Sequence, residues 1–423
     1  MATPSIRILH TADWHIGKTL YQRNRYEEFQ AFLEWLLETI QSERIDALIL
    51  AGDVFDTCTP SNRAQNLYYN FLGRLAASSC RHVVVTAGNH DSPSFLDAPK
   101  SILKQFQIHV VGDIPENIQD EVILLRDKDG HPELIVCAVP YLRDRDVRTS
   151  EAGESLETKE EKLREGIQQH YAQVAQAALQ LRDSLSKPVP IIAMGHLFTA
   201  GGETIAGDGV RNLYVGSLAH VESKIFPPCF DYVALGHLHV PQRVGGSDTI
   251  RFSGSPIPMG FGEATQQKYV NIVEWVQGKP LVTMLPIPSF QSLRSIQGDW
   301  PHIESAIREL QQSEQSIWLE VSYQGTEPIP NLRERVETLV QGTRLEPLRV
   351  SNTQSAMAIL SGTNTGESLE DLQPTDVFRK CLEIKQVPEE QWPILEACFR
   401  EIQVRLDEAD TAIANEESLG ENP

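Results

Sequence analysis

The chain has 423 residues, of which 41% are hydrophobic and 22% charged, and its formal net charge is -21. The length predicts roughly two to three domains. So negative a chain is unsuited to coating nucleic acid through a broad basic surface, although bound metal ions can supply positive charge locally. No apolar run approaches the roughly 20 residues of a membrane helix, and we see no secretory signal, so we expect a cytoplasmic protein without a membrane partner.

The cysteines are spread along the chain and form no Cys-x-x-Cys pair. We therefore expect buried free thiols rather than a disulfide framework or a zinc cluster. The six positions are Cys58, Cys80, Cys137, Cys229, Cys381 and Cys398.

Five short apolar runs in the first 240 residues are each followed by residues that are able to bind a metal ion. Runs this short, uniformly apolar and rich in β-branched residues predict strands that are buried on both faces. They span residues 6–10, 47–51, 82–86, 190–194 and 232–235.

Helices separate the first three runs. Phe29, Leu33, Leu36, Leu37 and Ile40 recur at helical spacing and predict one apolar helix face. A second helix is predicted over 62–75. The resulting order of strand, helix, strand, helix and strand implies a largely parallel sheet.

The rest of the first domain, which we place at 1–285, combines two kinds of segment. Residues 151–187 are rich in Glu, Lys, Gln and Ala and predict a long, largely exposed helix or helix pair. Residues 245–285 alternate short apolar runs with polar residues and predict antiparallel strands that complete the domain.

After residue 285 the pattern changes to that of a small α+β unit, which we place at 286–350. It contains a helix over 302–312, a strand over 317–323, a helix over 332–340 and a last strand over 344–350. Residues 351–373 are rich in Ser, Thr, Asn and Gly and predict a linker. Two amphipathic helices are expected within 374–406, and the acidic tail 407–423 is expected to be disordered.

The residues that follow the five predicted strands are the candidates for chemistry, because sites form at the carboxyl ends of such strands. Each motif is weak alone, since Asp and Asn are ordinary turn residues and paired histidines can be surface residues. The same arrangement at five strand ends favours a metal centre. The candidates are Asp13, His15, Asp53, Asn89, His90, His196, His237 and His239.

This mixture of ligands suits a pair of divalent ions. Two ions roughly 3.5–4 Å apart need a bridging carboxylate and terminal His, Asp or Asn ligands. Two aspartates and two such ions leave a local charge of about +2, which attracts a phosphodiester whatever the net charge of the protein. Mixed oxygen and nitrogen ligation fits manganese, iron or zinc and does not decide between them. Manganese is the metal that we choose as our expectation.

The ordered ligand set resembles that of the calcineurin-like metallophosphoesterases. This resemblance implies an α/β fold, a β-sandwich flanked by helices, followed here by the α+β unit and the C-terminal helices. The flanking text is similar to the SbcD family, the nuclease subunits of bacterial SbcCD complexes, which are related to double-strand-break repair nucleases. The resemblance covers residues 5–275, and beyond them only the domain order matches. The similar text lies at 10–17, 51–56, 254–258 and 268–270.

The resemblance implies a role for each site residue. Asp13, His15, Asp53 and His239 would hold one ion. Asp53, Asn89, His196 and His237 would hold the other, with Asp53 bridging the two. His90 would bind no metal and would protonate the leaving 3′ oxygen or stabilise the phosphate. Asp56 would orient this catalytic histidine, with a salt-linked turn residue as the alternative. His10 is interpreted as a core packing residue.

The function implied by the resemblance is that of a DNA nuclease in repair, recombination and replication. It would act as an exonuclease on double-stranded ends and as an endonuclease on hairpins or single strands. Residues 286–350 would cap the site and help to hold DNA. The 374–406 helices would dock an SbcC-like coiled-coil ATPase, and the chain would form a homodimer within a heterotetramer.

Two alternative functions remain. One is a metallophosphoesterase for small phosphodiesters, which would need neither the cap nor the C-terminal helices. The other is a non-catalytic scaffold for DNA ends, which would need no complete ligand set.

Overall fold

The computed structural model describes residues 6–148, 156–198, 223–325 and 329–352, together with residues 378, 382 and 392. These residues divide into two compact units. The first holds the described residues up to 295 together with 313–320 and 344–348, and the second holds the others. The predicted linker 351–373, the helices 374–406 and the tail 407–423 lie outside the described residues, except for residues 351, 352, 378, 382 and 392.

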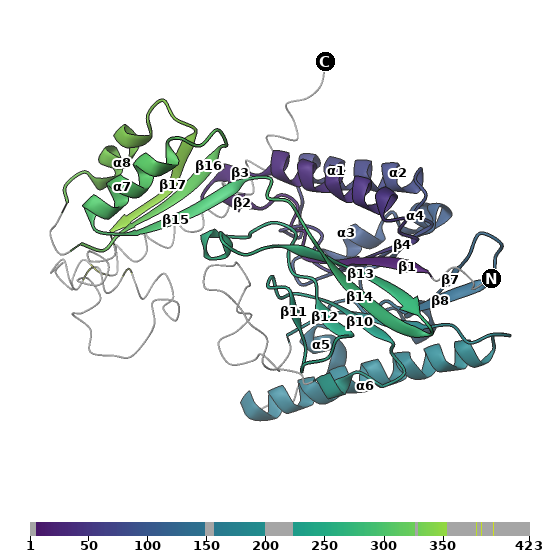
Figure 1. Ribbon diagram of the computed structural model, residues 1–423. Coiled ribbons are helices and arrows are strands. Elements are labelled where there is room, and N and C mark those ends of the chain that lie inside the picture. Colours follow the sequence, from purple (N-terminus) through teal and green to yellow (C-terminus); the bar gives the residue numbers. More distant parts are fainter. Residues whose placement is uncertain are drawn as a thin grey trace, which may run out of the picture. The chain divides into compact units, whose positions relative to one another are not determined.

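Two six-stranded sheets form the body of the first unit (Figure 1). The first sheet has the order β14 (Lys279–Pro286), β13 (Tyr269–Val276), β1 (Arg7–Thr11), β4 (Ala47–Ala51), β5 (His82–Thr86) and β6 (Ile108–Val111). The second has the order β11 (Gln242–Arg243), β12 (Ile250–Phe252), β10 (Tyr232–Gly236), β9 (Ile191–His196), β8 (Pro132–Cys137) and β7 (Val122–Arg126).

The first sheet confirms the predicted parallel opening. Strands β1, β4, β5 and β6 are parallel, and the antiparallel hairpin of β13 and β14 extends the sheet beside β1. Helices α1 (Tyr26–Ser42) and α2 (Asn62–Ala76) form the crossovers that join β1 to β4 and β4 to β5. Parallel neighbours need such crossovers, which is why the helical and apolar runs alternate in the sequence.

The second sheet is also largely parallel, since β8, β9, β10 and β12 run in the same direction. The prediction of antiparallel strands over 245–285 is right for β13 and β14, whereas β12 pairs antiparallel with β11 on one side and parallel with β10 on the other. Strand β12 has only three residues, too few for a pattern that would indicate its direction. Strands β6, β7 and β8 have no counterpart among the predicted elements.

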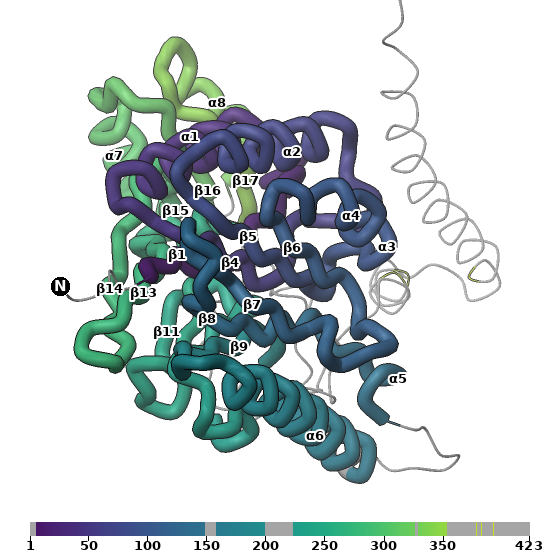
Figure 2. Tube along the Cα trace, turned by 90° about the vertical axis from the view of Figure 1, so that its right-hand side faces the viewer, coloured from purple at the N-terminus to yellow at the C-terminus, as the bar shows by residue number. Residues whose placement is uncertain are grey.

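The helices and sheets of the first unit are stacked in layers (Figure 2), and three apolar cores lie between these layers. One lies between the first sheet and helices α1 and α2, and it includes Phe29 and Leu48. A second lies between the two sheets and includes Ile49 and Ile192. The third lies between the second sheet and helix α6 (Leu156–Asp183). The predicted β-sandwich flanked by helices is therefore confirmed.

Helix α6 confirms the long helix predicted within residues 151–187 and decides against a helix pair. It is one helix of 28 residues, largely exposed, and one face of it is buried. Ile167, Tyr171, Val174 and Ala178 recur every three or four residues and pack on the second sheet. The sequence did not reveal this buried stripe, because the many Glu, Gln and Lys residues of the opposite face outweigh it in the composition.

Short elements complete the first unit. They are β2 (Thr19–Leu20), β3 (Arg23–Asn24), α3 (Pro93–Asp97), α4 (Lys100–Leu103), α5 (Asp144–Val147), and the 3-10 helices η1 (Lys104–Phe106), η2 (Ile118–Glu121), η3 (Ser223–Ile225) and η4 (Phe261–Glu263).

A three-stranded sheet follows in the order β15 (Ser292–Gly298), β16 (Ile317–Tyr323) and β17 (Leu345–Asn352). Two helices accompany it, α7 (Trp300–Leu310) and α8 (Leu332–Val340). The two helices and the last two strands match the predicted elements closely. Strand β15 was not predicted.

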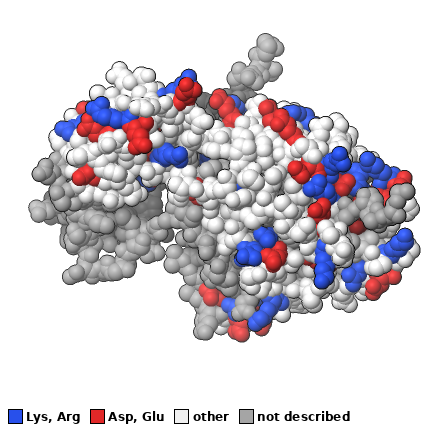
Figure 3. All heavy atoms as spheres, in the orientation of Figure 1, with Lys and Arg blue, Asp and Glu red and all other residues white. Residues whose placement is uncertain are grey.

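Two surface properties agree with the composition. Acidic and basic side chains are mixed on the face shown in Figure 3, with no broad basic area there. Within the described ranges, no helix is long and apolar enough to cross a membrane. The four cysteines among the described residues are free, as expected, but only Cys80 and Cys137 are buried, whereas Cys58 is exposed and Cys229 half-buried.

Candidate metal centre

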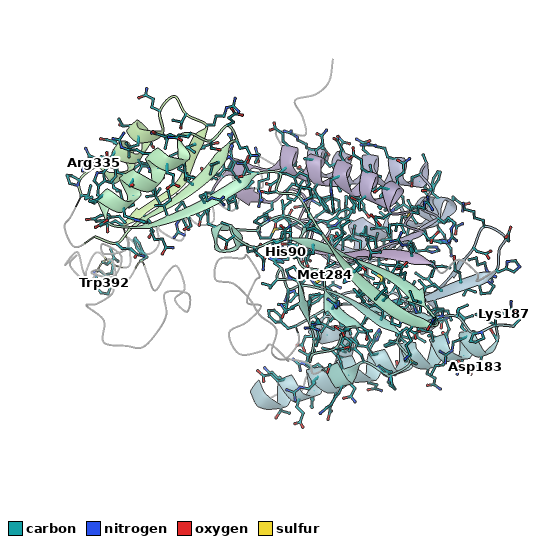
Figure 4. All side chains as sticks on the ribbon, in the orientation of Figure 1. His90, Asp183, Lys187, Met284, Arg335 and Trp392 are labelled. Carbon is teal, nitrogen blue, oxygen red and sulfur yellow. The ribbon has the colours of Figure 1, made fainter. Side chains whose placement is uncertain are left out.

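The predicted site residues lie at the carboxyl ends of strands from both sheets. Strands β1, β4 and β5 contribute from the first sheet, and β9 and β10 from the second. The two sheets therefore present these ends at the same edge of the sandwich, and His90 is labelled there in Figure 4. The residues brought together are Asp13, His15, Asp53, Asn89, His90, His196, His237 and His239.

The loops after β1 and β4 are joined by backbone hydrogen bonds. The N–H of Asp13 donates to the carbonyl of Gly52 (3.1 Å), and the N–H of His15 donates to that of Asp53 (3.0 Å). Asp13, His15, Asp53 and His237 have φ angles of 53°, 48°, 47° and 103°. Such angles are uncommon outside glycine and cluster where a functional site needs a fixed side-chain direction.

The first group of candidate ligands is Asp13, His15 and His239, whose ligand atoms all lie within 4.8 Å of one another. The Nε2 atoms of His15 and His239 face each other at 3.1 Å. Asp13 Oδ1 accepts a hydrogen bond from the backbone N–H of His237 (2.8 Å), whereas its Oδ2 is buried and has no hydrogen-bond partner. This buried oxygen is suited to a cation, because a buried acceptor that is left unpaired is costly.

The second group is Asp53, His196 and His237, joined by the side chain of Asn89. Asn89 Oδ1 lies 2.9 Å from His196 Nε2 and 2.8 Å from His237 Nδ1. The other ring nitrogen of His196, Nδ1, lies 3.1 Å from the carbonyl oxygen of Ala51. Because a carbonyl only accepts, Nδ1 carries the proton and Nε2 is left as the ligand atom.

Asp53 stands between the two groups. Its Oδ2 lies 3.5 Å from His15 Nε2 in the first group and 3.2 Å from His196 Nε2 in the second. Its Oδ1 accepts a hydrogen bond from the backbone N–H of His90 (2.8 Å), which fixes the orientation of the carboxylate. This is the position that a carboxylate bridging two ions must occupy.

The electrostatics of the centre also fit divalent cations. Burial raises the pKa of Asp13 to about 7, and the nearby charge of Asp53 acts in the same direction. Although burial opposes it, Asp53 raises the pKa of His196 to about 9, while burial and His196 lower that of His237 to about 3. Buried acids and imidazoles that compete for protons are relieved when metal ions take the place of those protons. The residues present therefore fit a pair of divalent ions.

His90 and Asp56 meet in a way that differs from the expectation. His90 Nδ1 lies 2.8 Å from the backbone carbonyl oxygen of Asp56. The Asp56 carboxylate instead contacts His15 Nδ1 (3.2 Å) and Lys18 Nζ (3.1 Å). Although burial opposes it, these two partners hold the pKa of Asp56 well below its usual range. Asp56 therefore contacts His90 through its main chain and a candidate metal ligand through its side chain.

Asp91 is a site residue to which the sequence gave us no reason to assign a role. Its carboxylate accepts hydrogen bonds from the backbone N–H groups of Val54 (3.0 Å), Phe55 (3.0 Å) and Gly88 (2.9 Å). It thereby ties the loop after β5 to the loop after β4. The available signal was its place in the Gly-Asn-His-Asp motif, where Asp is also an ordinary turn residue.

Gly88 allows the same two loops to approach. A Cβ atom at this position would lie 2.1 Å from Asp53 Oδ1. Only glycine leaves room for the candidate bridging carboxylate.

Asp127, Asp129 and His131 form a further acidic cluster, in the turn between β7 and β8. Asp127 Oδ1 accepts hydrogen bonds from the backbone N–H groups of Asp129 (2.9 Å) and His131 (2.8 Å). These bonds are those of an ordinary Asp turn and account for the cluster without a metal ion.

The comparisons with known proteins agree with this geometry. The family model described as calcineurin-like phosphoesterase matches residues 6–241. A second model, described as the Type 5 capsule protein repressor C-terminal domain, matches residues 289–386. The SbcD subunit of the nuclease SbcCD from Escherichia coli strain K12 is 36% identical over 93% of this chain and 97% of its own length. The subunit of the same name from Rhodobacter capsulatus is 37% identical over 67% of this chain and 69% of its own length. That from Bacillus subtilis is 36% identical over 66% of this chain and 71% of its own length.

Proposed function

Because the chain belongs to the SbcD family of calcineurin-like phosphoesterases, and is therefore a hydrolase of phosphate esters, we propose that it is a metal-dependent nuclease that cleaves DNA. The observation that carries this proposal is the position of Asp53, with one oxygen 3.5 Å from His15 Nε2 and 3.2 Å from His196 Nε2. A single carboxylate shared by two groups of ligands supports a two-metal hydrolase.

The seven candidate ligands divide between two ions, for which manganese is our choice. Asp13, His15, Asp53 and His239 would hold one ion. Asp53, Asn89, His196 and His237 would hold the other. When bound, the ions would supply a nucleophile at neutral pH and would stabilise the charge that develops on the phosphate.

His90 is the residue that we assign to the leaving group. Its Nδ1 donates to the carbonyl oxygen of Asp56, and we assign the other ring nitrogen, Nε2, to the substrate. The attacking water gives up one proton to solvent and adds its oxygen to phosphorus, and the bond from phosphorus to the 3′ oxygen breaks. His90 would give its proton to the 3′ oxygen, or would stabilise the phosphate while solvent supplies that proton. The products would be a 5′ phosphate and a 3′ hydroxyl.

The wider assembly is part of the proposal. The chain aligns with 97% of the length of its E. coli relative. That relative is a subunit of a nuclease named SbcCD. We assign residues 374–406 to docking an SbcC-like coiled-coil ATPase and residues 286–350 to capping the DNA, within a heterotetramer that contains two copies of this chain in the cytoplasm. Its activities would be exonuclease on double-stranded ends and endonuclease on hairpins and single strands.

One experiment separates this proposal from the two alternatives. The purified chain is given Mn²⁺ with end-labelled duplex DNA, hairpin DNA and a phenyl phosphodiester, with and without the ATPase partner. We expect the DNA to be cut. Hydrolysis of the phenyl ester alone, even with the partner present, would favour a small-molecule phosphodiesterase. Binding of DNA ends with no hydrolysis of any substrate would favour a scaffold.

A further inference from the structure

Two segments similar to the SbcD family, 254–258 and 268–270, supply no metal ligand, yet both reach His239. The backbone N–H of Ser255 donates to the carbonyl oxygen of His239 (3.2 Å), and Lys268 Nζ donates to the same oxygen (3.1 Å). Gly254 has a φ of 75°, and a Cβ atom there would lie 2.7 Å from this oxygen. The main chain of His239 is therefore held from a segment 15 to 29 residues further along the chain.

Lys268 is the centre of this contact. Its side chain is only 3% exposed, so its ammonium group needs protein partners. Besides the carbonyl of His239, Nζ lies 3.1 Å from Ser255 Oγ, 2.6 Å from Glu263 Oε2 and 2.5 Å from Gln266 Oε1. Three N–H bonds shared among four acceptors hold the ammonium group firmly in place.

Glu263 provides the balancing charge and reaches the imidazole of His239. The residue is fully buried, and Oε2 also accepts a hydrogen bond from the N–H of Met259 (2.9 Å). Its other oxygen, Oε1, lies 3.8 Å from His239 Nδ1. The opposite ring nitrogen, Nε2, faces His15 Nε2 at 3.1 Å. The ring thus has one nitrogen directed at the metal centre and the other near a fixed carboxylate.

This arrangement matches a general property of metal sites. A histidine that binds a metal usually donates its second ring N–H to a carboxylate or carbonyl, which sets its tautomer and orientation. A movement of about 1 Å would bring Glu263 Oε1 within hydrogen-bond distance of His239 Nδ1. A buried ion pair by itself adds little stability. The position of the Lys268–Glu263 pair beside His239 therefore indicates a role in addition to stability.

We propose that Lys268 and Glu263 are positioning residues that hold His239 as a metal ligand, Lys268 through the main chain and Glu263 through the ring. This inference rests on the metal centre of the proposed function. It assigns a role to the Lys268 segment and to the Gly254-Ser255 turn that the ligand set leaves unexplained.

The test uses metal binding and no DNA. Mn²⁺ is titrated by calorimetry into the metal-free full-length chain and into the variants Glu263→Gln and Lys268→Met, and the visible spectrum of bound Co²⁺ is recorded. The matched control is Glu121→Gln, which changes another fully buried carboxylate. Glu121 lies in η2, and its Oε2 is 2.9 Å from His170 Nε2. Circular dichroism and thermal unfolding show whether each variant is folded.

We expect one of the two Mn²⁺ sites to weaken by about 10- to 100-fold in both variants, with a changed Co²⁺ spectrum. The control should keep the affinity and the spectrum of the original chain. Unchanged affinity and spectrum in folded Glu263→Gln would overturn the proposal. If both variants unfold, Lys268→Arg takes their place, because it keeps the charge but moves the hydrogen-bond donors. Unchanged Mn²⁺ affinity in Lys268→Arg would also overturn the proposal.

The result is independent of the nuclease assignment. If the chain binds two ions and cuts no DNA, the proposed function fails while the role of Glu263 and Lys268 stands. If the chain cuts DNA and Glu263→Gln binds both ions normally, only the positioning role fails.

Discussion

His90 Nδ1 lies 2.8 Å from the backbone carbonyl oxygen of Asp56, so the main chain of Asp56 orients the histidine that we assign to the leaving group. A carbonyl oxygen has no acidic state and accepts at every pH at which the protein is folded. The main chain of Asp56 therefore favours the tautomer of His90 with the proton on Nδ1, whichever charge its side chain carries.

Replacing His90 by Ala should lower DNA cleavage by about 10²- to 10⁴-fold and leave both metal ions bound, because its ring would act on the leaving group alone. Cleavage of end-labelled duplex and Mn²⁺ calorimetry measure the two effects. His131→Ala, in the exposed turn between β7 and β8, serves as the control. Loss of both ions in His90→Ala would show that our division between ligands and catalytic histidine is wrong.

Asp56→Asn should act through the metal and leave His90 in place. The change removes the carboxylate that lies 3.2 Å from His15 Nδ1 but keeps the main-chain carbonyl. We expect Mn²⁺ affinity to fall by about 10- to 100-fold and cleavage to recover at saturating Mn²⁺. Cleavage that stays low when both sites are filled would indicate that the side chain acts on His90 after all.

Gly88→Ala should disrupt the centre without touching a ligand. The added Cβ would lie 2.1 Å from Asp53 Oδ1, so the candidate bridging carboxylate must move. We expect binding of at least one Mn²⁺ ion to be lost. The matched control is Gly73→Ala on α2, where a Cβ meets nothing within 4 Å and should stabilise the helix by about 0.5–1 kcal/mol. Two normal sites in Gly88→Ala would contradict the tight approach.

His10 should make the metal-free protein sensitive to acid. It is fully buried between the sheets, with Nδ1 2.8 Å from the hydroxyl of Tyr232, and burial lowers its pKa from 6.5 to about 3. The stability tied to this low pKa is complete above pH 6.5. It is lost as the pH falls towards 3, because the unfolded chain takes up the proton first. Between pH 7 and 5 the loss is about 2 kcal/mol.

Urea unfolding in EDTA at these two pH values measures this effect. The His10→Asn variant should lose about 2 kcal/mol less than the original chain between pH 7 and 5, since asparagine does not titrate. An equal loss in both proteins would mean that His10 does not stay neutral in the folded state.

Deleting residues 374–423 should spare binding of both Mn²⁺ ions and abolish capture of an SbcC-like ATPase. The deletion leaves every candidate ligand in place and removes the segment that we assign to docking. The shorter deletion of 407–423, the acidic tail, is the control and should keep capture intact. Capture of the partner by the chain that lacks 374–423 would refute the docking role.

The strands that carry the candidate ligands could be predicted from the sequence, and the physical reason is local. A strand buried on both faces must be apolar throughout, and the chain must turn where it leaves the sheet. Asp13, Asp53 and His237 stand just after such runs, so their approach could be expected before any contact was known. The same reasoning applies to helices α1 and α2, whose apolar stripes have the helical period.

Contacts through space were decided only by the tertiary structure. The strand runs give no sign that β9 and β10 belong to a second sheet, since every buried parallel strand has the same pattern. The buried face of α6 depends on the sheet that it covers. Glu263 reaches His239 across 24 positions because β13 folds back beside β1, and no spacing rule encodes that return.

The carbonyl and carboxylate oxygens of Asp56 show the same division between what the sequence predicts and what the tertiary structure decides. The family resemblance, rather than its spacing alone, marked Asp56 as a site residue, three residues after Asp53 in the same loop. Whether its carbonyl or its carboxylate faces His90 depends on backbone torsions and on where His15 and Lys18 lie. Local sequence determines which residues reach the edge of the sheet, and packing decides which of their atoms meet.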